Sequence, residues 1–334
     1  MPEKKLLLSI DGGGIRGILP VCMLVRLEEQ TGKRARDIFS FVAGTSTGSV
    51  ITGGIAAGIP AADMLNLYLK RGNDVFPRHL LDPAWKWGRR FIRGHFFSTA
   101  PLRRVLEEEA LDSAGWKLNE APIDIMITAK RIDDGMPWYF VKDNPRNSGR
   151  TGNLPLVDCV TASCVVPTYH EPWTVPEPNP PAGHRPVGRL VDGGVGVAGN
   201  PVYQACVEAF DYSEAYTPEE TIVVSLGTGH FTALANPSSI LDWLGWTLGE
   251  LLDSAGEQQT ALVQRHYGGL PFYRLQPALP RSIGGDSVKS VPALHEIGLK
   301  FAARIDWEPI LAGEASDFRI GEANTLARQY SVAV

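Results

Sequence analysis

The sequence has few cysteines and no long apolar run. Its four cysteines include no C-x-x-C pair, and the small residues around them are typical of buried thiols, which favours a reducing compartment over a disulfide framework. The apolar stretch at residues 50–59 is too short to cross a membrane, and its glycines suit close packing. The N-terminal apolar run stops at Ile10, beside Asp11, without the longer core and cleavage site of a signal peptide. We therefore expect neither a membrane-spanning protein nor a disulfide-stabilised scaffold.

The chain also lacks an excess of basic residues. Its formal net charge of −5 argues against a nucleic-acid polymer as the partner. A hydrophobic content of 44% and a charged content of 21% are typical of a globular protein with a sizeable core. No internal repeat or linker divides the 334 residues. We expect a single domain over residues 1–334, with its motifs within about 5–230 and a helical and strand extension from about 231 onward.

Strand-like and helix-like segments alternate along the chain. Short runs dominated by apolar residues predict strands at 4–10, 38–43, 123–128, 138–141, 189–191 and 221–226. Apolar residues at helical spacing predict helices at 15–30, 47–57, 61–70, 99–111, 156–165, 239–255 and 292–304. The prolines of residues 172–187 predict a loop. This alternation is typical of an α/β core with a largely parallel sheet.

A serine lies at the centre of residues 44–48, GTSTG, directly after a predicted strand. The flanking glycines allow a tight strand-to-helix turn, which exposes the side chain and points the N-terminus of the next helix toward it. A serine hydroxyl is a poor nucleophile until a base takes its proton. The pattern predicts Ser46 as a candidate nucleophile that needs a nearby base.

Two further glycine-rich motifs follow predicted strands: DGGGIRG at residues 11–17 and DGG at 192–194. During acyl transfer, negative charge forms on the carbonyl oxygen, and each backbone N–H that meets this charge is worth roughly 3–4 kcal/mol. Arg16 adds a positive charge beside the first motif, and Asp192 supplies a carboxylate in the second. Each motif alone also occurs as an ordinary turn, but the three together predict an acyl hydrolase.

These motifs resemble those of the patatin-like phospholipases. Residues 161–172, TASCVVPTYHEP, are similar to the block that precedes the catalytic aspartate in that family, so the resemblance covers residues 5 to about 230. It implies a three-layer α/β/α fold with a mostly parallel central sheet. It also implies a dyad without a catalytic histidine, in which Ser46 is the nucleophile and Asp192 is the base.

The resemblance extends to the oxyanion hole and to the substrate. By position, the oxyanion hole is formed by the backbone N–H groups of Gly12, Gly13 and Gly14, with Arg16 adjacent. The family hydrolyses ester bonds of phospholipids and related acyl lipids and needs neither a cofactor nor a metal. We therefore expect a cytoplasmic enzyme that acts at the membrane surface. The oligomeric state, the preferred lipid and any nucleotide-controlled switch stay open.

Three other functions are consistent with parts of the sequence. A Ser-His-Asp α/β-hydrolase would use Ser46, Asp192 and His295, but Ser46 follows only two predicted strands and His295 has the spacing of a helix surface. A dinucleotide-binding oxidoreductase would use the glycines of residues 12–17, but it needs an acidic residue where the second strand instead ends in GTSTG. A lipid-binding protein without activity would have lost Ser46 or Asp192.

One segment interleaves aromatic residues with cations: AWKWGRRFIRGHFF at residues 84–97. Such a segment favours peripheral membrane contact, with its aromatic residues in lipid and its cations at the headgroups. An ordinary core helix with extended cationic side chains has the same composition. The sequence leaves these two interpretations equal.

Overall fold

The computed structural model describes residues 4–75, 98–110, 115–146, 149–167, 170–177, 187–196, 199–231, 256–280, 283 and 288–320. Three expectations lie outside these residues: the interfacial segment 84–97, the helix at 239–255 and most of the proline-rich loop.

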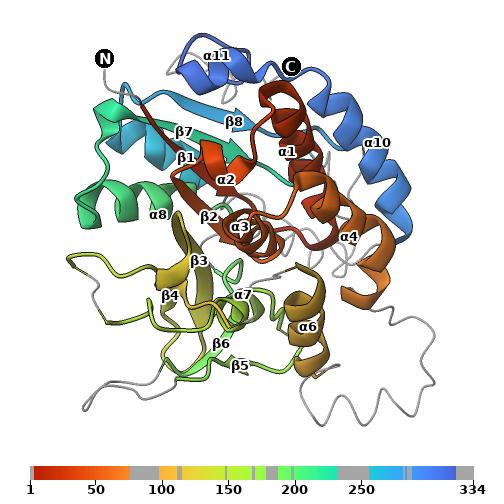
Figure 1. The fold of residues 1–334 in the computed structure, drawn as a ribbon, viewed down its shortest axis with the longest axis vertical. Helices are drawn as coiled ribbons and strands as arrows, with labels where there is room; N and C mark the ends of the chain where they lie inside the picture. The colour runs from red at the N-terminus through yellow and green to blue at the C-terminus, as the bar shows by residue number, and fades with distance from the viewer. Residues whose placement is uncertain are drawn as a thin grey trace, which may run out of the picture.

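A mixed eight-stranded sheet forms the centre of the described fold (Figure 1). Its strands are β1 (Lys5–Ile10), β2 (Phe41–Thr45), β3 (Asp124–Arg131), β4 (Pro137–Val141), β5 (Trp173–Thr174), β6 (Arg189–Asp192), β7 (Thr221–Leu226) and β8 (Phe272–Leu275). The strand order is β5-β6-β3-β2-β1-β7-β8, and β4 pairs with β3. Five strands, from β3 to β8 in that order, run parallel, whereas β4 and β6 are antiparallel to β3. The expected mostly parallel sheet is confirmed.

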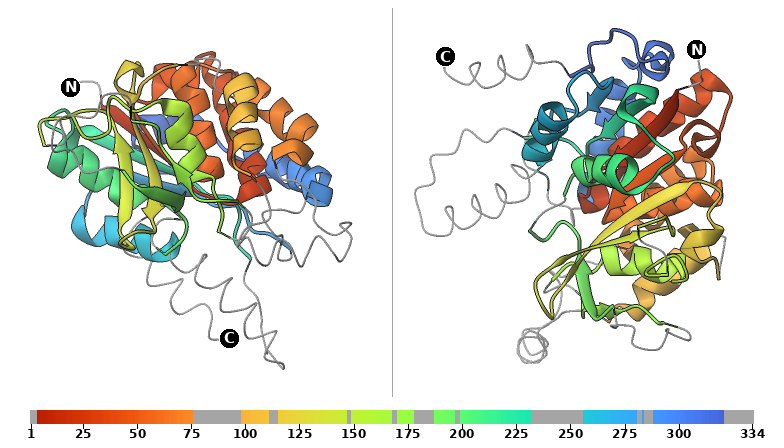
Figure 2. Two further views of the ribbon diagram at one scale, coloured as in Figure 1. Left: turned by 90° about the horizontal axis from the view of Figure 1, so that it is seen from below. Right: turned by 90° about the vertical axis from the view of Figure 1, so that its left-hand side faces the viewer.

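Helices cover both faces of this sheet (Figure 2). The α-helices that lie wholly within the described residues include α1 (Ile18–Thr31), α2 (Ala35–Ile38), α3 (Thr47–Ala57), α4 (Ala61–Val75), α6 (Ala100–Val105), α7 (Leu156–Ser163), α8 (Val202–Val207), α10 (Val291–Ala302) and α11 (Trp307–Ala312). Short 3₁₀ or π-helical turns are Gly14–Gly17, Leu106–Ala110, Leu118–Glu120, Glu208–Tyr212, Pro218–Glu220 and Val288–Ser290. A further helix passes through residues 256–266.

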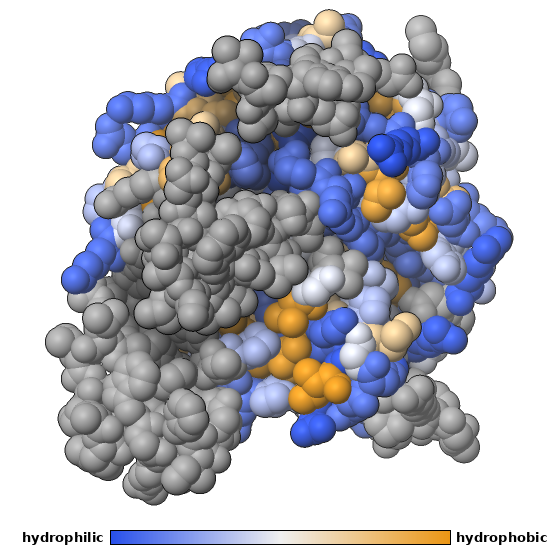
Figure 3. All heavy atoms as spheres, turned by 180° about the vertical axis from the view of Figure 1, so that it is seen from behind, coloured by the Kyte–Doolittle hydropathy of each residue, from blue (hydrophilic) through white to orange (hydrophobic). Residues whose placement is uncertain are grey.

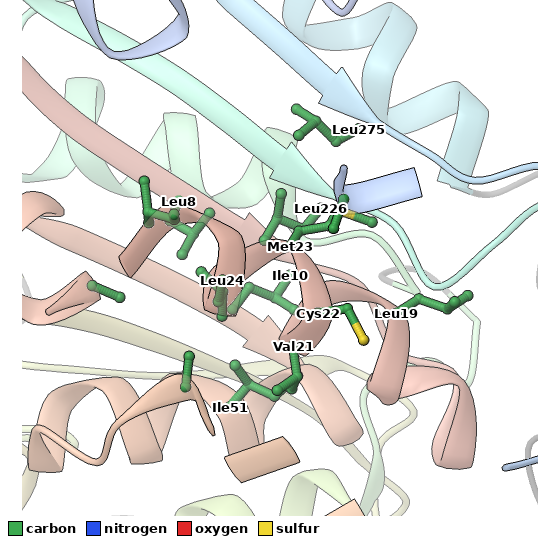
Figure 4. Close-up of a cluster of buried hydrophobic side chains, with 14 of the residues drawn as sticks. Leu8, Ile10, Leu19, Val21, Cys22, Met23, Leu24, Ile51, Leu226 and Leu275 are labelled. Atoms are coloured by element: carbon green, nitrogen blue, oxygen red, sulfur yellow. The ribbon is translucent and has the colours of Figure 1, made fainter. Parts of the chain in front are cut away.

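The alternation of side chains along β1 explains the three layers. Successive strand residues point to opposite faces of a sheet. Leu8 and Ile10 accordingly join the core formed with α1, α4 and α10, part of which Figure 4 shows. Leu7 joins the core formed with α8 on the other face. Both faces of the strand are therefore buried, which gives its continuous apolar sequence.

Several elements were absent from the sequence-based expectations, namely α2, α8, α11, β5 and β8. The loop expected at 172–187 was wrong at its start, because Trp173–Thr174 forms the short strand β5 and pairs with β6. The expected strand at 38–43 begins later, because Ile38 ends the short helix α2 and β2 starts at Phe41. β8 was missed because it is only four residues long and carries a charged residue, Arg274, at a buried position. It pairs in parallel with β7 and so brings the C-terminal part of the chain into the same sheet.

A buried ion pair joins β8 to the first glycine-rich motif. Arg274 donates to both carboxylate oxygens of Asp11, at 2.9 and 2.6 Å, and also to the hydroxyl of Ser225 at 2.8 Å. The Asp11 N–H donates to the carbonyl of Leu226 at 3.0 Å. Planar guanidinium and carboxylate groups make such bidentate pairs with a defined geometry. The loop after β1 is therefore fixed to β7 and β8.

Candidate active site

The register of β3 brings two distant motifs together. β4 pairs with one edge of β3 over residues that include Thr128 and Ala129. β2 pairs with Thr128 through Thr45, and β6 pairs with Ala129 through Asp192. Each strand has only two edges, so β2 and β6 share the edge opposite β4. The C-terminal ends of β2 and β6 therefore meet on this edge, because Thr45 and Asp192 pair with consecutive residues of β3. Ser46, the residue after Thr45, consequently lies beside Asp192.

Ser46 occupies a strained turn between β2 and α3. Its φ of 53° and ψ of −123° make it the one non-glycine residue with positive φ in the described part of the chain. Such backbone conformations cost of order 1–3 kcal/mol and are common at functional sites. The flanking glycines permit the turn: a Cβ on Gly44 would lie 2.2 Å from the Gly48 carbonyl oxygen, and one on Gly48 would lie 2.3 Å from that of Ile10.

Asp192 ends β6 as a buried carboxylate that faces the serine. Burial raises its pKa to about 6, although hydrogen bonds from the Ser46 hydroxyl and the Gly194 N–H act in the opposite direction. The Gly194 bond measures 2.8 Å. Gly193 is required by close approach, since a Cβ there would lie 2.2 Å from the hydroxyl oxygen of Thr128. A carboxylate with a pKa near neutrality and a hydrogen bond to a serine can act as a general base.

The first glycine-rich loop lies against the same turn. A Cβ on Gly12 would lie 3.4 Å from the Ser46 Cβ. The Gly12 N–H is already engaged, because it donates to the Gly199 carbonyl at 2.7 Å. Among the described residues, no acceptor is recorded for the N–H groups of Gly13 and Gly14. The oxyanion hole of Gly12, Gly13 and Gly14 stays a prediction, for which the Gly13 and Gly14 N–H groups are the available donors.

Arg16 and Thr228 connect the first glycine-rich loop to the segment that follows β7. The Arg16 guanidinium approaches the Gly229 carbonyl at 3.5 Å, and the Thr228 hydroxyl donates to the Gly12 carbonyl at 2.6 Å. Thr228 also explains Gly13, where an added Cβ would lie 2.5 Å from the threonine hydroxyl oxygen. The contact of Arg16 is thus with the segment after β7, and its contribution to charge stabilisation stays a prediction.

His295 lies on α10, which packs against α1 and also contacts the Gly14–Gly17 turn. Among the described residues, no recorded hydrogen bond joins His295 to Ser46 or Asp192. The dinucleotide alternative also lacks its key group, because β2 ends in Thr45 and the Ser46 turn instead of in an acidic residue.

Sequence reasoning missed the residues that contact the Ser46 turn from α7. Ser163 accepts a hydrogen bond from the Ser46 N–H at 2.9 Å, and the Cys164 thiol lies 3.3 Å from the Ser46 carbonyl oxygen. Both belong to TASCVVP, which the sequence analysis connected with the aspartate and not with the serine. The sequence analysis identified that block as a motif, but the contact of Ser163 and Cys164 with Ser46 depends on the packing of α7 against α3.

Two exposed apolar side chains follow segments that contact Ser46 and Asp192. Val166, which follows the Ser163–Val165 segment, is 40% exposed, and Val195, which follows the DGG motif, is 37% exposed. Other exposed hydrophobic residues are scattered over the described surface. Figure 3 shows the face opposite to that of Figure 1, where hydrophobic side chains gather only in small areas among hydrophilic ones.

The described residues contain neither a helix suited to span a membrane nor a cluster suited to bind a metal. No described helix combines the length and the apolar character needed to cross a bilayer. No group of histidine, cysteine, aspartate and glutamate side chains in these residues is arranged to hold a metal ion.

Comparison with known proteins gives consistent matches. The model of the family described as patatin-like phospholipase matches residues 8–206. The chain is 25% identical over 265 residues to the cGAMP-activated phospholipase of Vibrio cholerae serotype O1, covering 74% of this chain and 71% of the relative. It is 27% identical over 296 residues to patatin-like protein 2 of Arabidopsis thaliana, covering 78% and 70%. Among solved structures, VipD from Legionella pneumophila aligns with a TM-score of 0.45 at 13% identity, covering 94% of this chain and 67% of that chain.

The burial of Asp192 predicts a pH-dependent cost to folding. Its pKa is raised in the folded protein, so the penalty is absent at low pH, grows as the pH rises from the unfolded value of 3.8, and is complete above about 6. Asp192→Asn should increase the free energy of unfolding at pH 8 by about 1–2 kcal/mol, because a shift of this size costs roughly 3 kcal/mol and the amide loses one hydrogen bond.

Urea unfolding of both proteins at pH 8 and pH 5 tests this, and the difference should shrink at pH 5. Glu296→Gln is the control, since that carboxylate is 67% exposed on α10 and its replacement should give no comparable gain. Equal or lower stability of Asp192→Asn at pH 8 would show that the carboxylate is not penalised by burial.

Proposed function

Because the chain belongs to the patatin-like phospholipase family, we propose that it hydrolyses carboxylic esters of membrane-derived acyl lipids with a Ser46–Asp192 dyad. The observation that carries this proposal is the hydrogen bond between the Ser46 hydroxyl and a buried carboxylate whose pKa burial raises to about 6. A base with this pKa is ionised at neutral pH and still binds a proton strongly enough to take one from serine.

In the proposed reaction, Ser46 Oγ attacks the ester carbonyl carbon while Asp192 accepts the hydroxyl proton. The N–H groups of Gly13 and Gly14 stabilise the negative charge on the former carbonyl oxygen. When the tetrahedral intermediate collapses, the alcohol or lysolipid leaves with the proton from Asp192, and the acyl group stays on Ser46. Asp192 then deprotonates a water molecule, which attacks the acyl-enzyme, releases the fatty acid and restores the Ser46 hydroxyl.

The surroundings of the dyad favour an acyl lipid over a polar ester. Val166 and Val195 expose apolar surface where the chain leaves the site. A fatty acyl chain gains free energy at such a surface, at roughly 0.8 kcal/mol for each CH₂ group removed from water. We assign phospholipase A or lysophospholipase activity to the chain on this basis.

We also propose that the whole chain acts as one catalytic domain. β8 lies in the same sheet as the motif-bearing strands, and Arg274 from β8 holds Asp11 of the glycine-rich loop. The residues after about 230 would then be part of the catalytic unit.

Ser46→Ala should abolish release of fatty acid from mixed phospholipid vesicles, with a loss of at least ~10³-fold, because no other group forms the acyl-enzyme. Mass spectrometry of the lipid products measures this and identifies the cleaved acyl position. His295→Ala is the matched control and should stay within about twofold of the unmodified protein. Full activity in Ser46→Ala, or a folded but inactive His295→Ala protein, would overturn the dyad.

A second proposal concerns control of this activity by a nucleotide. A cavity of about 450 Å³ lies between the end of β8, residues 317–320 and α10. Cationic and aromatic side chains dominate its lining, which also contains one carboxylate: Lys300, Phe301, Arg304, Asp317, Phe318 and Arg319. Cations bind phosphates, and aromatic rings and guanidinium groups stack on bases. Arg274 also lines the cavity and contacts Asp11, so a ligand there is connected to the glycine-rich loop.

The similar phospholipase of Vibrio cholerae is cGAMP-activated, and we propose cGAMP as the probe for this cavity. Addition of cGAMP should increase phospholipid hydrolysis several-fold, and Arg304→Glu should reduce this activation without lowering the basal rate, because it reverses one lining charge. Arg150→Glu is the control, an exposed cation elsewhere. No response of the unmodified protein to cGAMP would reject this control mechanism and leave the hydrolase proposal intact.

A further inference from the structure

Three consecutive residues, the last residue of α7 and the two that follow it, contact both members of the proposed dyad. The Ser163 hydroxyl accepts a hydrogen bond from the Ser46 N–H at 2.9 Å. The Cys164 thiol donates to the Ser46 carbonyl at 3.3 Å. The Val165 carbonyl accepts from the Asp192 N–H at 2.8 Å. We call Ser163–Val165 the bridge segment, because it is bonded to the backbone of the nucleophile on one side and to that of the base on the other.

The Ser46 carbonyl and the Ser46 N–H differ in the number of hydrogen-bond partners they have. The Ser46 carbonyl already accepts from the Ser49 N–H at 2.8 Å, the Ser49 hydroxyl at 2.6 Å and the Val50 N–H at 3.3 Å, so the Cys164 thiol adds little. The Ser46 N–H has a single recorded partner among the described residues, which is Ser163. This N–H belongs to the one non-glycine residue with positive φ in that part of the chain. The Ser163 hydroxyl therefore holds the strained turn at its least supported point.

The bridge segment rests on a firmly held helix. α7 packs against α3, β3 and β6, and Ser163 is completely buried at its end. Near the start of the helix, Asp158 is also buried and accepts two hydrogen bonds from Arg103, at 2.8 and 3.1 Å. A displacement of Ser163 relative to the sheet would have to move this ion pair as well.

We propose that Ser163 is a positioning residue for the reaction. Its hydroxyl holds the Ser46 backbone, and the Val165 carbonyl of the same segment holds the Asp192 backbone, so the segment fixes the position of Ser46 relative to Asp192. This inference rests on the proposed dyad and adds a residue to it. Ser163 acts through Ser46 and does not touch the substrate. Misplacement of a reacting group by about 1 Å can cost 10²-fold in rate, so a single support for the turn is sufficient to matter.

The test is a comparison of Ser163→Ala with Thr161→Ala. Thr161 is the matched control, because its buried hydroxyl lies on the same helix and bonds at 2.7 Å within the helix to the Val157 carbonyl. Hydrolysis of p-nitrophenyl butyrate gives kcat and KM, and thermal unfolding gives Tm. Ser163→Ala should lose at least ~10-fold in kcat with KM changed less than about threefold, while Thr161→Ala keeps kcat within about twofold at a similar Tm.

A purely structural role of Ser163 predicts a lower Tm with unchanged kcat in the folded protein, and that result would overturn the proposal. Equal losses of kcat in both variants would overturn it as well. Ser163→Cys keeps a side-chain acceptor of similar volume and should have a kcat between those of Ser163→Ala and the unmodified protein; it also provides the comparison if the alanine variant does not fold. An unmodified protein without Ser46-dependent esterase activity would instead reject the proposed function.

Discussion

The structure depends on the shared edge of β3. β2 and β6 pair with consecutive residues on this edge, and they approach it from opposite directions. A parallel strand therefore delivers Ser46, and an antiparallel strand delivers Asp192, to one point without a long loop on either side. The mixed character of the sheet is what brings residues 46 and 192 together. If β6 ran parallel to β3, its C-terminal end, which carries Asp192, would point away from the place where it now meets Ser46.

This arrangement has costs that other contacts offset. Ser46 has a strained backbone, and Asp192 is a carboxylate whose pKa is raised by burial. Such features persist only where the surroundings determine them. Here the glycines at 44, 48 and 193 allow the close approaches, α7 supports the turn through Ser163, and the Asp11–Arg274 ion pair fixes the glycine-rich loop to β8. The site is thus supported from several elements that are distant in sequence.

The sequence was informative where function requires local backbone geometry. The glycines around Ser46, after Asp11 and after Asp192 each satisfy a steric requirement of their own turn. The motifs therefore predicted the α/β fold and led to the proposed Ser46–Asp192 dyad. The support for the site was not predictable in this way. β8 is short and carries the charged residue Arg274, which obscures its strand character. Ser163 differs from the other small residues of α7 only because the Ser46 N–H lies within hydrogen-bonding distance of its hydroxyl. The engagement of the Gly12 N–H by Gly199 depends on tertiary contact in the same way.

The central claim is that Asp192, and no histidine, activates Ser46. The most direct measurement is the second-order rate at which a fluorophosphonate labels Ser46 between pH 4 and 9, with the labelled peptide identified by mass spectrometry. We expect the rate in the unmodified protein to rise with an apparent pKa of about 6, as Asp192 ionises, and this rise to be absent in Asp192→Asn, which should label at a uniformly low rate. Labelling of Asp192→Asn at the unmodified rate, or labelling at a residue other than Ser46, would contradict the account.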